Sequence, residues 1–326
     1  MAEGIRTRSQ QLNLSLRKEN EQKLRTAVAL LKVQDVRRIL ESGLSPNNVD
    51  SFGWTLLHVA AYHSRDRMMR LLLEFKGDPC IPDKIAHFTC LHYASMNGKT
   101  RMAKLILEYD EAHTKQGLVN QKGKEGLTAL HLAVRNGHTA CVRLLLQHHA
   151  DVNAKSTEEI TPLVLAIVWE RIGCLKMLIN WSADIDTDVG LPLQYSIMKG
   201  RSHCTKMLLQ HGANPNLKHY EDGQAPLHIA AMKDDLNTCV ILYAYGADCV
   251  NKNEDGLTPV AVARQRSSLD RPCLQYLTEV SRNPRSLQDM CRIVIRNSIG
   301  KSRLSKINSL PLCRIMLEYL SYKFDG

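Results

Sequence analysis

Apolar residues with the spacing of short α-helices recur along most of the chain. Residues 126–153 show the pattern twice, with apolar side chains at Leu130, Leu132 and Ala133 and then at Val142, Leu145 and Leu146. One pair of helices cannot bury both apolar faces, so neighbouring pairs must stack. The pattern predicts a mainly α-helical solenoid in which each helix pair contacts only the pairs before and after it.

A four-residue signature opens most of the predicted helix pairs. Its fullest form is Thr-x-Leu-His, and its first residues are Thr55, Thr89, Thr128, Thr161, Leu191, Ala225 and Thr258, separated by 34, 39, 33, 30, 34 and 33 residues. The threonine hydroxyl can cap the first helix. The histidine recurs at one structural position, which predicts a hydrogen bond shared between neighbouring turns. A period near 33 residues with this wording is typical of ankyrin repeats.

Most of the chain therefore resembles the ankyrin-repeat family. We expect a flexible segment at residues 1–20, seven to eight repeats with short hairpin loops at residues 21–281, and a separate module at residues 282–326. The first repeat lacks the signature, as expected of a terminal capping repeat. The third repeat is lengthened by an insertion at residues 109–118, and the fifth is shortened at residues 184–190.

Residues just past the second helices carry a signal for helix termination. Gly43, Gly77, Gly212 and Gly246 occupy these positions, where a left-handed backbone ends a helix at little cost. His149 and Ser182 stand at the equivalent positions of two other repeats. We therefore expect those two helix ends to be less regular.

The net charge limits the kinds of macromolecule that the chain can attract, and the N-terminal sequence limits where in the cell it is expected. The 43 lysine and arginine residues exceed the 33 carboxylates, which gives a formal net charge of +10. Such an excess attracts acidic proteins or nucleic acids, but no nucleic-acid motif and no aromatic platform accompanies it. The N-terminus lacks the apolar core of a secretory signal, and no apolar run is long enough to cross a bilayer. We expect an intracellular protein of the cytoplasm or nucleus without a membrane partner.

The residues that usually carry catalysis or bind metals are arranged here as structural residues. Ten cysteines occur without a Cys-x-x-Cys pair, and Cys141, Cys174, Cys204 and Cys239 share one position that is typical of a helical core. The signature histidines also share one position, and no nucleophile elbow, phosphate loop or zinc-protease motif is present. We expect no enzymatic activity of the chain itself, no cofactor and no metal.

The repeat pattern stops after Pro284. A helix is predicted from Ser286, which can cap it, and Leu287, Cys291 and Ile295 form an apolar stripe at i, i+4 and i+8. A second amphipathic turn follows near the chain end, with Ile315, Met316, Tyr319 and Leu320. From these residues alone, two interpretations stay open: the helices cover the last repeat, or they bind another protein.

Placed directly after ankyrin repeats, this segment resembles the SOCS box of the ankyrin-repeat and SOCS-box (ASB) family, a small three-helix module. The resemblance implies that Leu287 enters a pocket of elongin C, that Cys291 packs against this partner and that Ile295 continues the contact. It also implies that Leu310, Pro311 and Leu312 begin a motif that selects cullin 5. Cys313 departs from this motif, where a second proline is expected.

The resemblance implies a non-catalytic receptor subunit of an E3 ubiquitin ligase. The repeats would bind a target protein, elongin C with elongin B would connect the box to cullin 5 and its RING-box partner, and the target would be ubiquitinated and degraded. The alternative is an ankyrin adaptor that organises partners without ubiquitination.

The target is expected to contact the exposed ends of the first helices. The candidate residues there are His63, Arg135, Trp169, Met198, Lys199, Met232 and Lys233. Trp169 is the strongest candidate because aromatic residues and arginines dominate interface energetics. Its alternative role is to cover the shortened repeat that follows it. Trp54 is expected to pack in the first hairpin, and Trp181 fits either role.

Overall fold

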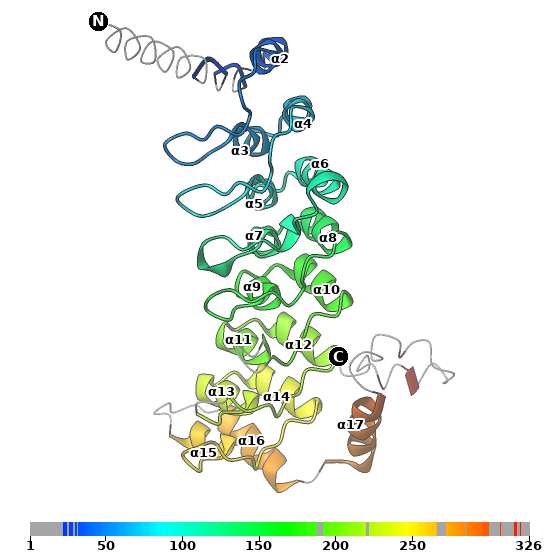
Figure 1. Ribbon diagram of the computed structural model, residues 1–326. Coiled ribbons are helices and arrows are strands. Elements are labelled where there is room, and N and C mark those ends of the chain that lie inside the picture. Colours follow the sequence, from blue (N-terminus) through cyan, green and yellow to red (C-terminus); the bar gives the residue numbers. More distant parts are fainter. Residues whose placement is uncertain are drawn as a thin grey trace, which may run out of the picture. The chain divides into compact units, whose positions relative to one another are not determined.

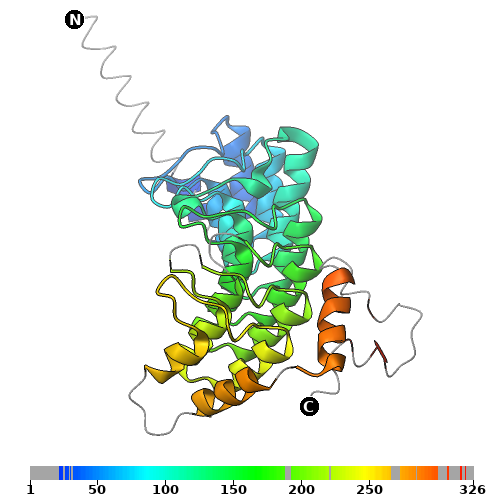
Figure 2. The same ribbon diagram turned by 90° about the horizontal axis from the view of Figure 1, so that it is seen from below.

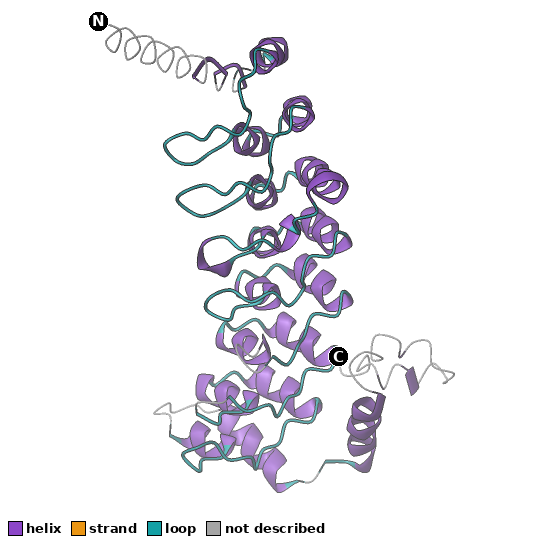
Figure 3. Ribbon diagram, in the orientation of Figure 1, coloured by secondary structure: helices purple, strands orange, loops and turns teal. Residues whose placement is uncertain are grey.

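The computed structural model describes residues 22–24, 26–28, 30, 32–187, 192–219, 222–265, 272–283, 285–299, 307, 316–317 and 320. Within this part of the chain, every regular element is a helix (Figure 3). The helices belong to two compact units, which are divided between Glu158 and Glu159. The predicted flexible segment, residues 1–20, lies outside the described residues.

Unit 1 consists of stacked helix pairs. Its helices are α2 (Val33–Glu41), α3 (Leu56–Tyr62), α4 (Asp66–Glu74), α5 (Cys90–Met96), α6 (Thr100–Tyr109), α7 (Ala129–Arg135) and α8 (Thr139–Gln147), with the short helices η1 (Asp110–Thr114), η2 (Leu118–Asn120) and η3 (Lys124–Gly126). The first helices α3, α5 and α7 pack against one another in order, and the second helices α4, α6 and α8 form a parallel layer (Figure 1).

Unit 2 continues the same pattern and ends in an additional helix. Its helices are α9 (Pro162–Val168), α10 (Ile172–Asn180), α11 (Pro192–Met198), α12 (Ser202–Gln210), α13 (Pro226–Lys233), α14 (Leu236–Ala244), α15 (Pro259–Arg264), α16 (Pro272–Arg282) and α17 (Leu287–Ile299). The first helices pack in the order α9, α11, α13 and α15, and α12, α14 and α16 form the second layer. Helix α17 lies outside both layers, beside the second helices (Figures 1 and 2).

The core forms between the two layers, as the apolar pattern predicts. In the repeat of residues 126–153, all six predicted core side chains are at most 3% exposed. Cys141, Cys174, Cys204 and Cys239 are completely buried, and burial raises the pKa of each thiol. The predicted repeat fold and the structural role of these cysteines are confirmed. No helix within the described part of the chain combines the length and apolarity needed to cross a bilayer.

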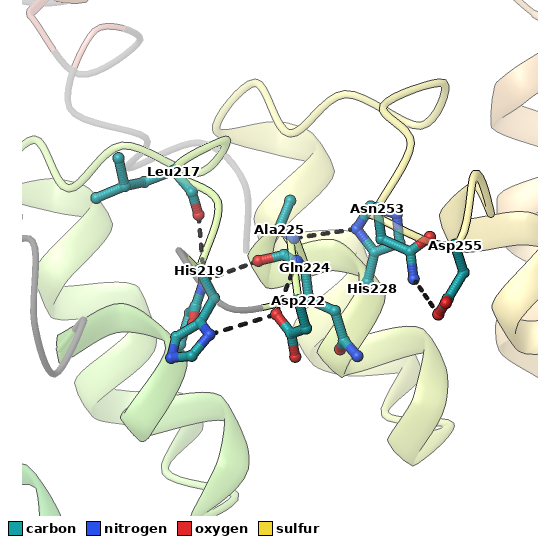
Figure 4. A network of polar contacts seen from close by, with 9 residues as sticks. Leu217, His219, Asp222, Gln224, Ala225, His228, Asn253 and Asp255 are labelled. Carbon is teal, nitrogen blue, oxygen red and sulfur yellow. Dashed lines mark hydrogen bonds and ion pairs between the residues drawn. The ribbon is translucent and has the colours of Figure 1, made fainter.

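The signature histidines His58, His92 and His228 each join their repeat to the next. His228 accepts a hydrogen bond at Nδ1 from the backbone N–H of Ala225, 3.1 Å away, so Nε2 carries the proton (Figure 4). Nε2 donates to the carbonyl of Leu257 in the following repeat, at 3.0 Å. His58 and His92 make the same pair of bonds. The predicted hydrogen bond between neighbouring turns is therefore confirmed.

The sixth repeat, which begins at Leu191, has Gln194 at the position of the signature histidine. Its amide Nε2 donates to the carbonyls of Leu217 and Gln224, at 3.2 and 3.0 Å. Because the amide reaches the carbonyl oxygens that precede the next first helix, this repeat is joined to its neighbour in the same way. A side-chain donor at this position therefore matters more than the imidazole ring.

Helix termination differs from the expectation at three positions. His149 and Ser182 adopt left-handed backbone at φ 64° and 61°, as Gly212 does at 92°. The closing hydrogen bonds, from the N–H of residues 150, 183 and 213, are 2.9, 3.0 and 3.0 Å long. The expected irregularity was wrong because the surrounding bonds hold non-glycine residues in this conformation. Gly77 is not left-handed, because Lys76 takes that position at φ 61°.

The insertion in the third repeat is an ordered structure. The buried carboxylate of Asp110 accepts hydrogen bonds from the hydroxyl of Thr114 and, at 3.0 Å, from the backbone N–H of Leu118. Glu111 forms an ion pair with His148 at the end of α8, at 2.6 Å. The contacts of Asp110 fold the extra residues within the third repeat, and the contact of Glu111 joins them to the second helix of the following repeat.

Candidate protein-binding site

Helix α17 places its charged and apolar side chains on unexpected sides. Arg292 and Arg296 are only 4% and 6% exposed. The apolar side chains of Leu287, Val294 and Ile295 are 77%, 61% and 41% exposed. The helix therefore faces its own chain with arginines and faces solvent with apolar residues.

Arg296 anchors α17 to the end of α12. Its Nη2 donates to the carbonyls of Gln210 and Leu209 at 2.9 and 3.4 Å, and its Nη1 donates to the carbonyl of Leu320 at 2.5 Å. The guanidinium carbon also lies 5.6 Å from the ring centre of Tyr245. The last carbonyls of a helix have no partner within the helix and carry partial negative charge. A guanidinium with five N–H donors satisfies several of them at once.

Arg285 makes a second anchor at the end of α14. Its Nη2 donates to the carbonyls of Ala247 and Tyr243, at 2.5 and 3.0 Å, and its guanidinium lies 4.2 Å from the ring centre of Tyr243. Between the two anchors, the backbone of Gly246 comes close to Ile293, because a Cβ atom at this glycine would lie 3.2 Å from Ile293 Cγ2. Helix α17 is thus docked on two successive second helices.

The predicted cap at the start of α17 is present. The backbone N–H of Asp289 donates to Ser286 Oγ at 3.1 Å, and the Ser286 hydroxyl lies 2.5 Å from Asp289 Oδ2. Arg292 donates to the same carboxylate at 2.8 Å. The cap fixes where the helix begins and therefore which side each later residue faces.

We define the outer face of α17 as Leu287, Met290, Cys291, Val294 and Ile295. All five side chains are exposed. The sequence predicted three of them. Met290 and Val294 were missed although they lie at i+3 and i+7 from Leu287, which is also helical spacing. The interpretation of this stripe as a cover for the last repeat is wrong, because its side chains are exposed. The side chains that contact the ends of α12 and α14 are Arg285, which precedes α17, and Ile293 and Arg296 on the inner side of the helix.

The segment after α17 has a small core of its own. Ile307 and Leu320 are 4% and 3% exposed, and Ile299 and Leu317 pack against them. Beyond Ile299 the structure describes only residues 307, 316, 317 and 320. The candidate cullin contacts Leu310, Pro311 and Leu312, together with Cys313, lie outside the described residues, as do most residues of the expected second and third helices.

The predicted target-binding residues all lie exposed at the ends of first helices. They are His63 and Arg135 in unit 1, and Trp169, Met198, Lys199, Met232 and Lys233 in unit 2. Arg135 is the last residue of α7, so its equivalent in unit 2 is Met198, which ends α11. Within unit 2, the ends of α11 and α13 are joined because Lys233 Nζ donates to the carbonyl of Met198 at 2.6 Å.

The other two tryptophans differ in their surroundings. The ring centre of Trp54 lies 4.8 Å from that of Tyr93 and 5.7 Å from that of Tyr62. Its expected packing role is therefore confirmed. Trp181, at the end of α10, is 43% exposed.

Comparison with protein families agrees with both parts of the chain. A family model described as ankyrin repeats in three copies matches residues 24–117, 112–189 and 186–253. A family model described as SOCS box matches residues 283–321, which include α17.

Individual relatives give the same combination. The chain is 37% identical over 142 residues to ankyrin repeat and SOCS box protein 5 of Bos taurus, covering 43% of this chain and 41% of that protein. The chain thus matches about two-fifths of the length of this relative.

Solved structures resemble the repeats. The ankyrin repeat domain of Bcl-3, a member of the IkappaB family, aligns with a TM-score of 0.62 at 26% identity and covers 69% of this chain and 99% of that chain. The human ASB11 ankyrin repeat domain aligns with a TM-score of 0.55, also at 26% identity, and covers 71% and 99%.

Proposed function

Because the chain belongs to the ankyrin repeat and SOCS box family, we propose that it is the substrate-receptor subunit of a cullin–RING ubiquitin ligase. In this proposal the outer face of α17 binds elongin C, and elongin B joins through elongin C. Leu310, Pro311 and Leu312 contact cullin 5, which carries the RING-box protein. The repeats hold a target protein in the cytoplasm or nucleus. The chain contributes proximity between target and ubiquitin, and no chemistry of its own.

The observation that carries this proposal is the orientation of α17. Arg296 is buried, at 6% exposure, while the side chains of the outer face stay in solvent. Contiguous apolar surface of this kind is costly in water and marks sites where another protein binds. Since Arg285 and Arg296 already attach the helix to the repeats, the outer face is available to a second protein without any rearrangement of unit 2.

The decisive experiment is Leu287→Asp in the full chain, followed by measurement of the affinity for purified elongin B/C. A carboxylate forced into an apolar pocket should weaken binding by about 100-fold or more. Leu287 is 77% exposed, so the repeats should melt at an unchanged temperature. Gln288→Asp is the matched control, because the neighbouring residue is also exposed but lies outside the outer face. Full elongin binding by the folded Leu287→Asp protein would favour the adaptor function instead.

The cullin contact is tested separately. Leu310→Ala combined with Pro311→Ala should weaken capture of cullin 5 more than capture of elongin B/C. Parallel pull-downs from one preparation compare the two partners directly. Equal losses would count against the assignment of these residues to cullin 5.

A further inference from the structure

Three large apolar side chains emerge at the ends of three successive first helices of unit 2. Trp169 after α9, Met198 at the end of α11 and Met232 in the last turn of α13 are 47%, 52% and 45% exposed. Each is next to a charged residue, and Lys199 and Lys233 follow the two methionines directly. We call these five residues the methionine face.

The residues of the methionine face lie on neighbouring helices. Helix α11 packs against both α9 and α13, and packed helices have axes about 8–10 Å apart. The bond from Lys233 Nζ to the carbonyl of Met198, at 2.6 Å, joins two of the helix ends directly. A bound segment that crosses these helices could therefore contact Trp169, Met198 and Met232 in succession.

The acidic side chains near this face already have partners, whereas its two lysines form no ion pair among the described residues. The carboxylate of Glu170 is held by Arg201 at 2.6 Å. The carboxylate of Asp235 accepts hydrogen bonds from the backbone N–H and the hydroxyl of Thr238, at 3.0 and 2.6 Å. Within the part of the chain that the structure describes, neither lysine of the face forms an ion pair with a carboxylate. The carboxylate of Asp234, directly after Lys233, accepts a hydrogen bond from the backbone N–H of Cys273 at 3.3 Å. The three neighbouring carboxylates thus have partners within unit 2, and the two lysines present positive charge at the face.

We propose that the methionine face binds an extended or helical segment of the target protein that carries two or three large apolar side chains with aspartate or glutamate beside them. Tryptophan contributes a rigid anchor, and unbranched methionines adapt to apolar side chains of different shapes. The two ammonium groups select for carboxylates over basic flanks. The inference depends on the proposed receptor function only where it names the bound protein a target for ubiquitination.

Unit 1 shows that this composition is not a general property of the repeats. At the position of Met198 and Met232, unit 1 has Tyr62, Met96 and Arg135. Met96 is less exposed than either methionine of the face. The residues that follow these helices directly are polar: His63, Asn97 and Asn136. Tyr62, the large side chain in the last turn of α3, contacts Trp54 and Tyr93 of its own unit. The proposal therefore retains the five unit 2 candidates and predicts no comparable role for His63 and Arg135.

A displayed library of random peptides, selected on the intact full chain, tests the proposal without knowledge of the target. The same library is selected in parallel on the triple variant Trp169→Ser, Met198→Ser and Met232→Ser. Peptides enriched on the wild type but not on the variant should combine at least two large apolar residues with nearby aspartate or glutamate. Enrichment that is equal on both proteins, a library that yields no such peptide, or peptides with basic flanks would overturn the proposal.

The strongest selected peptide then separates the apolar and electrostatic contributions by fluorescence anisotropy. The triple variant should bind it at least about tenfold more weakly, as expected when a central aromatic anchor is lost. Lys199→Glu with Lys233→Glu should also weaken binding about tenfold and reverse its dependence on salt. Lys176→Glu, on α10, and His63→Ser with Arg135→Ser are matched controls that should bind normally. Normal binding by the double lysine variant would remove the charge requirement from the proposal.

Failure of this inference is distinguishable from failure of the ligase proposal. Elongin capture is measured on every variant of the methionine face and should be unchanged, because α17 is untouched. Conversely, Leu287→Asp should bind the selected peptide normally. All variants are checked by thermal unfolding, since side chains that are about half exposed can be replaced with little loss of stability.

Discussion

Helices α12 and α17 of unit 2 contact each other but bury opposite kinds of side chain. Helix α12 buries Met207, Leu208 and Leu209 at 5%, 0% and 2% exposure, as repeat helices do. Helix α17 buries Arg292 and Arg296 and leaves its apolar side chains in solvent. The two helices show that amphipathicity alone does not determine which side of a helix faces the core.

The difference arises from the surface on which α17 docks. That surface consists of the carbonyl ends of α12 and α14, which require hydrogen-bond donors. Arginine supplies these donors and tolerates burial because its charge is matched by carbonyl dipoles. Ile293 packs on the inner side beside Gly246, whereas the five side chains of the outer face have no such role. They remain exposed for a partner that brings its own apolar surface.

The comparison predicts very different thiol reactivity in the two helices. Cys291 on α17 is exposed, whereas Cys204 on α12 is completely buried and has a pKa raised to about 11 by desolvation. Under a short pulse of N-ethylmaleimide at neutral pH, Cys291 should be labelled at least about 1,000-fold faster, because a buried thiol reacts only after local opening. Mass spectrometry of peptides locates the label.

Addition of elongin B/C provides the control for this measurement. It should protect Cys291 and leave the slow labelling of Cys204 unchanged. Rapid labelling at Cys291 that persists under saturating elongin B/C would show that the outer face is not the contact surface.

Leucine-to-alanine substitutions in α12 and α17 should change the free energy of unfolding by very different amounts. Leu208→Ala should destabilise the chain by about 3 kcal/mol, because it leaves a cavity between the helix layers. Leu287→Ala, at a side chain that is 77% exposed, should change stability by less than about 0.5 kcal/mol. Urea unfolding of both variants measures the two losses of stability. Comparable losses would mean that Leu287 is a core residue in solution.

The repeat period allowed most of the fold to be predicted from sequence. Residues such as Leu145 and Val142 recur with a helical period, and each repeat supplies an independent reading of the same pattern. Three of the five residues of the outer face of α17, Leu287, Cys291 and Ile295, were predicted for the same reason, because they follow that period. Local periodicity is sufficient to predict whether a side chain is buried wherever its surroundings are formed by its own helix and the adjacent repeats.

The anchors of α17 were not predictable in this way. In the sequence, Arg285 and Arg296 resemble ordinary solvent-exposed charges. Their partners are backbone carbonyls, which every residue has, so the sequence does not identify them. The carbonyl of Gln210 lies 86 residues away along the chain from Arg296. Likewise, the left-handed conformation of His149 and Ser182 is imposed by hydrogen bonds of the surrounding turn rather than by residue type.

Acid should destabilise the repeats through their buried signature histidines. Burial lowers the pKa of His92 to about 4, whereas the unfolded value is near 6.5. The unfolded chain therefore binds the proton more readily, so the stability from neutral His92 is complete above pH 6.5 and is lost as the pH falls through 4. Between pH 7 and pH 5 this amounts to about 2 kcal/mol. At the docking surface of α17, burial and the nearby charge of Arg296 also lower the pKa of His211, so acid should disfavour this contact as well.

His92→Gln isolates this effect, because Gln194, in the sixth repeat, makes the equivalent bond to the next repeat. Urea unfolding of unit 1 within the full chain, at pH 7 and pH 5, should show that the variant loses less free energy of unfolding in acid than the wild type does. The same acid loss in both proteins would assign the sensitivity to other groups.

Arg296→Met tests whether the inner side of α17 acts only in attachment. Methionine keeps the apolar stem but leaves the carbonyls of Gln210 and Leu320 without their donor, which should weaken docking of α17 by about 1–2 kcal/mol. Hydrogen exchange over residues 287–299 should accelerate about tenfold or somewhat more, in line with that loss. Arg282→Met on α16, where the side chain is exposed, is the matched control. Elongin B/C should still bind Arg296→Met within a few-fold, because the outer face is unchanged. If Arg296→Met abolished elongin binding as Leu287→Asp is expected to do, the two sides of α17 could not have separate roles.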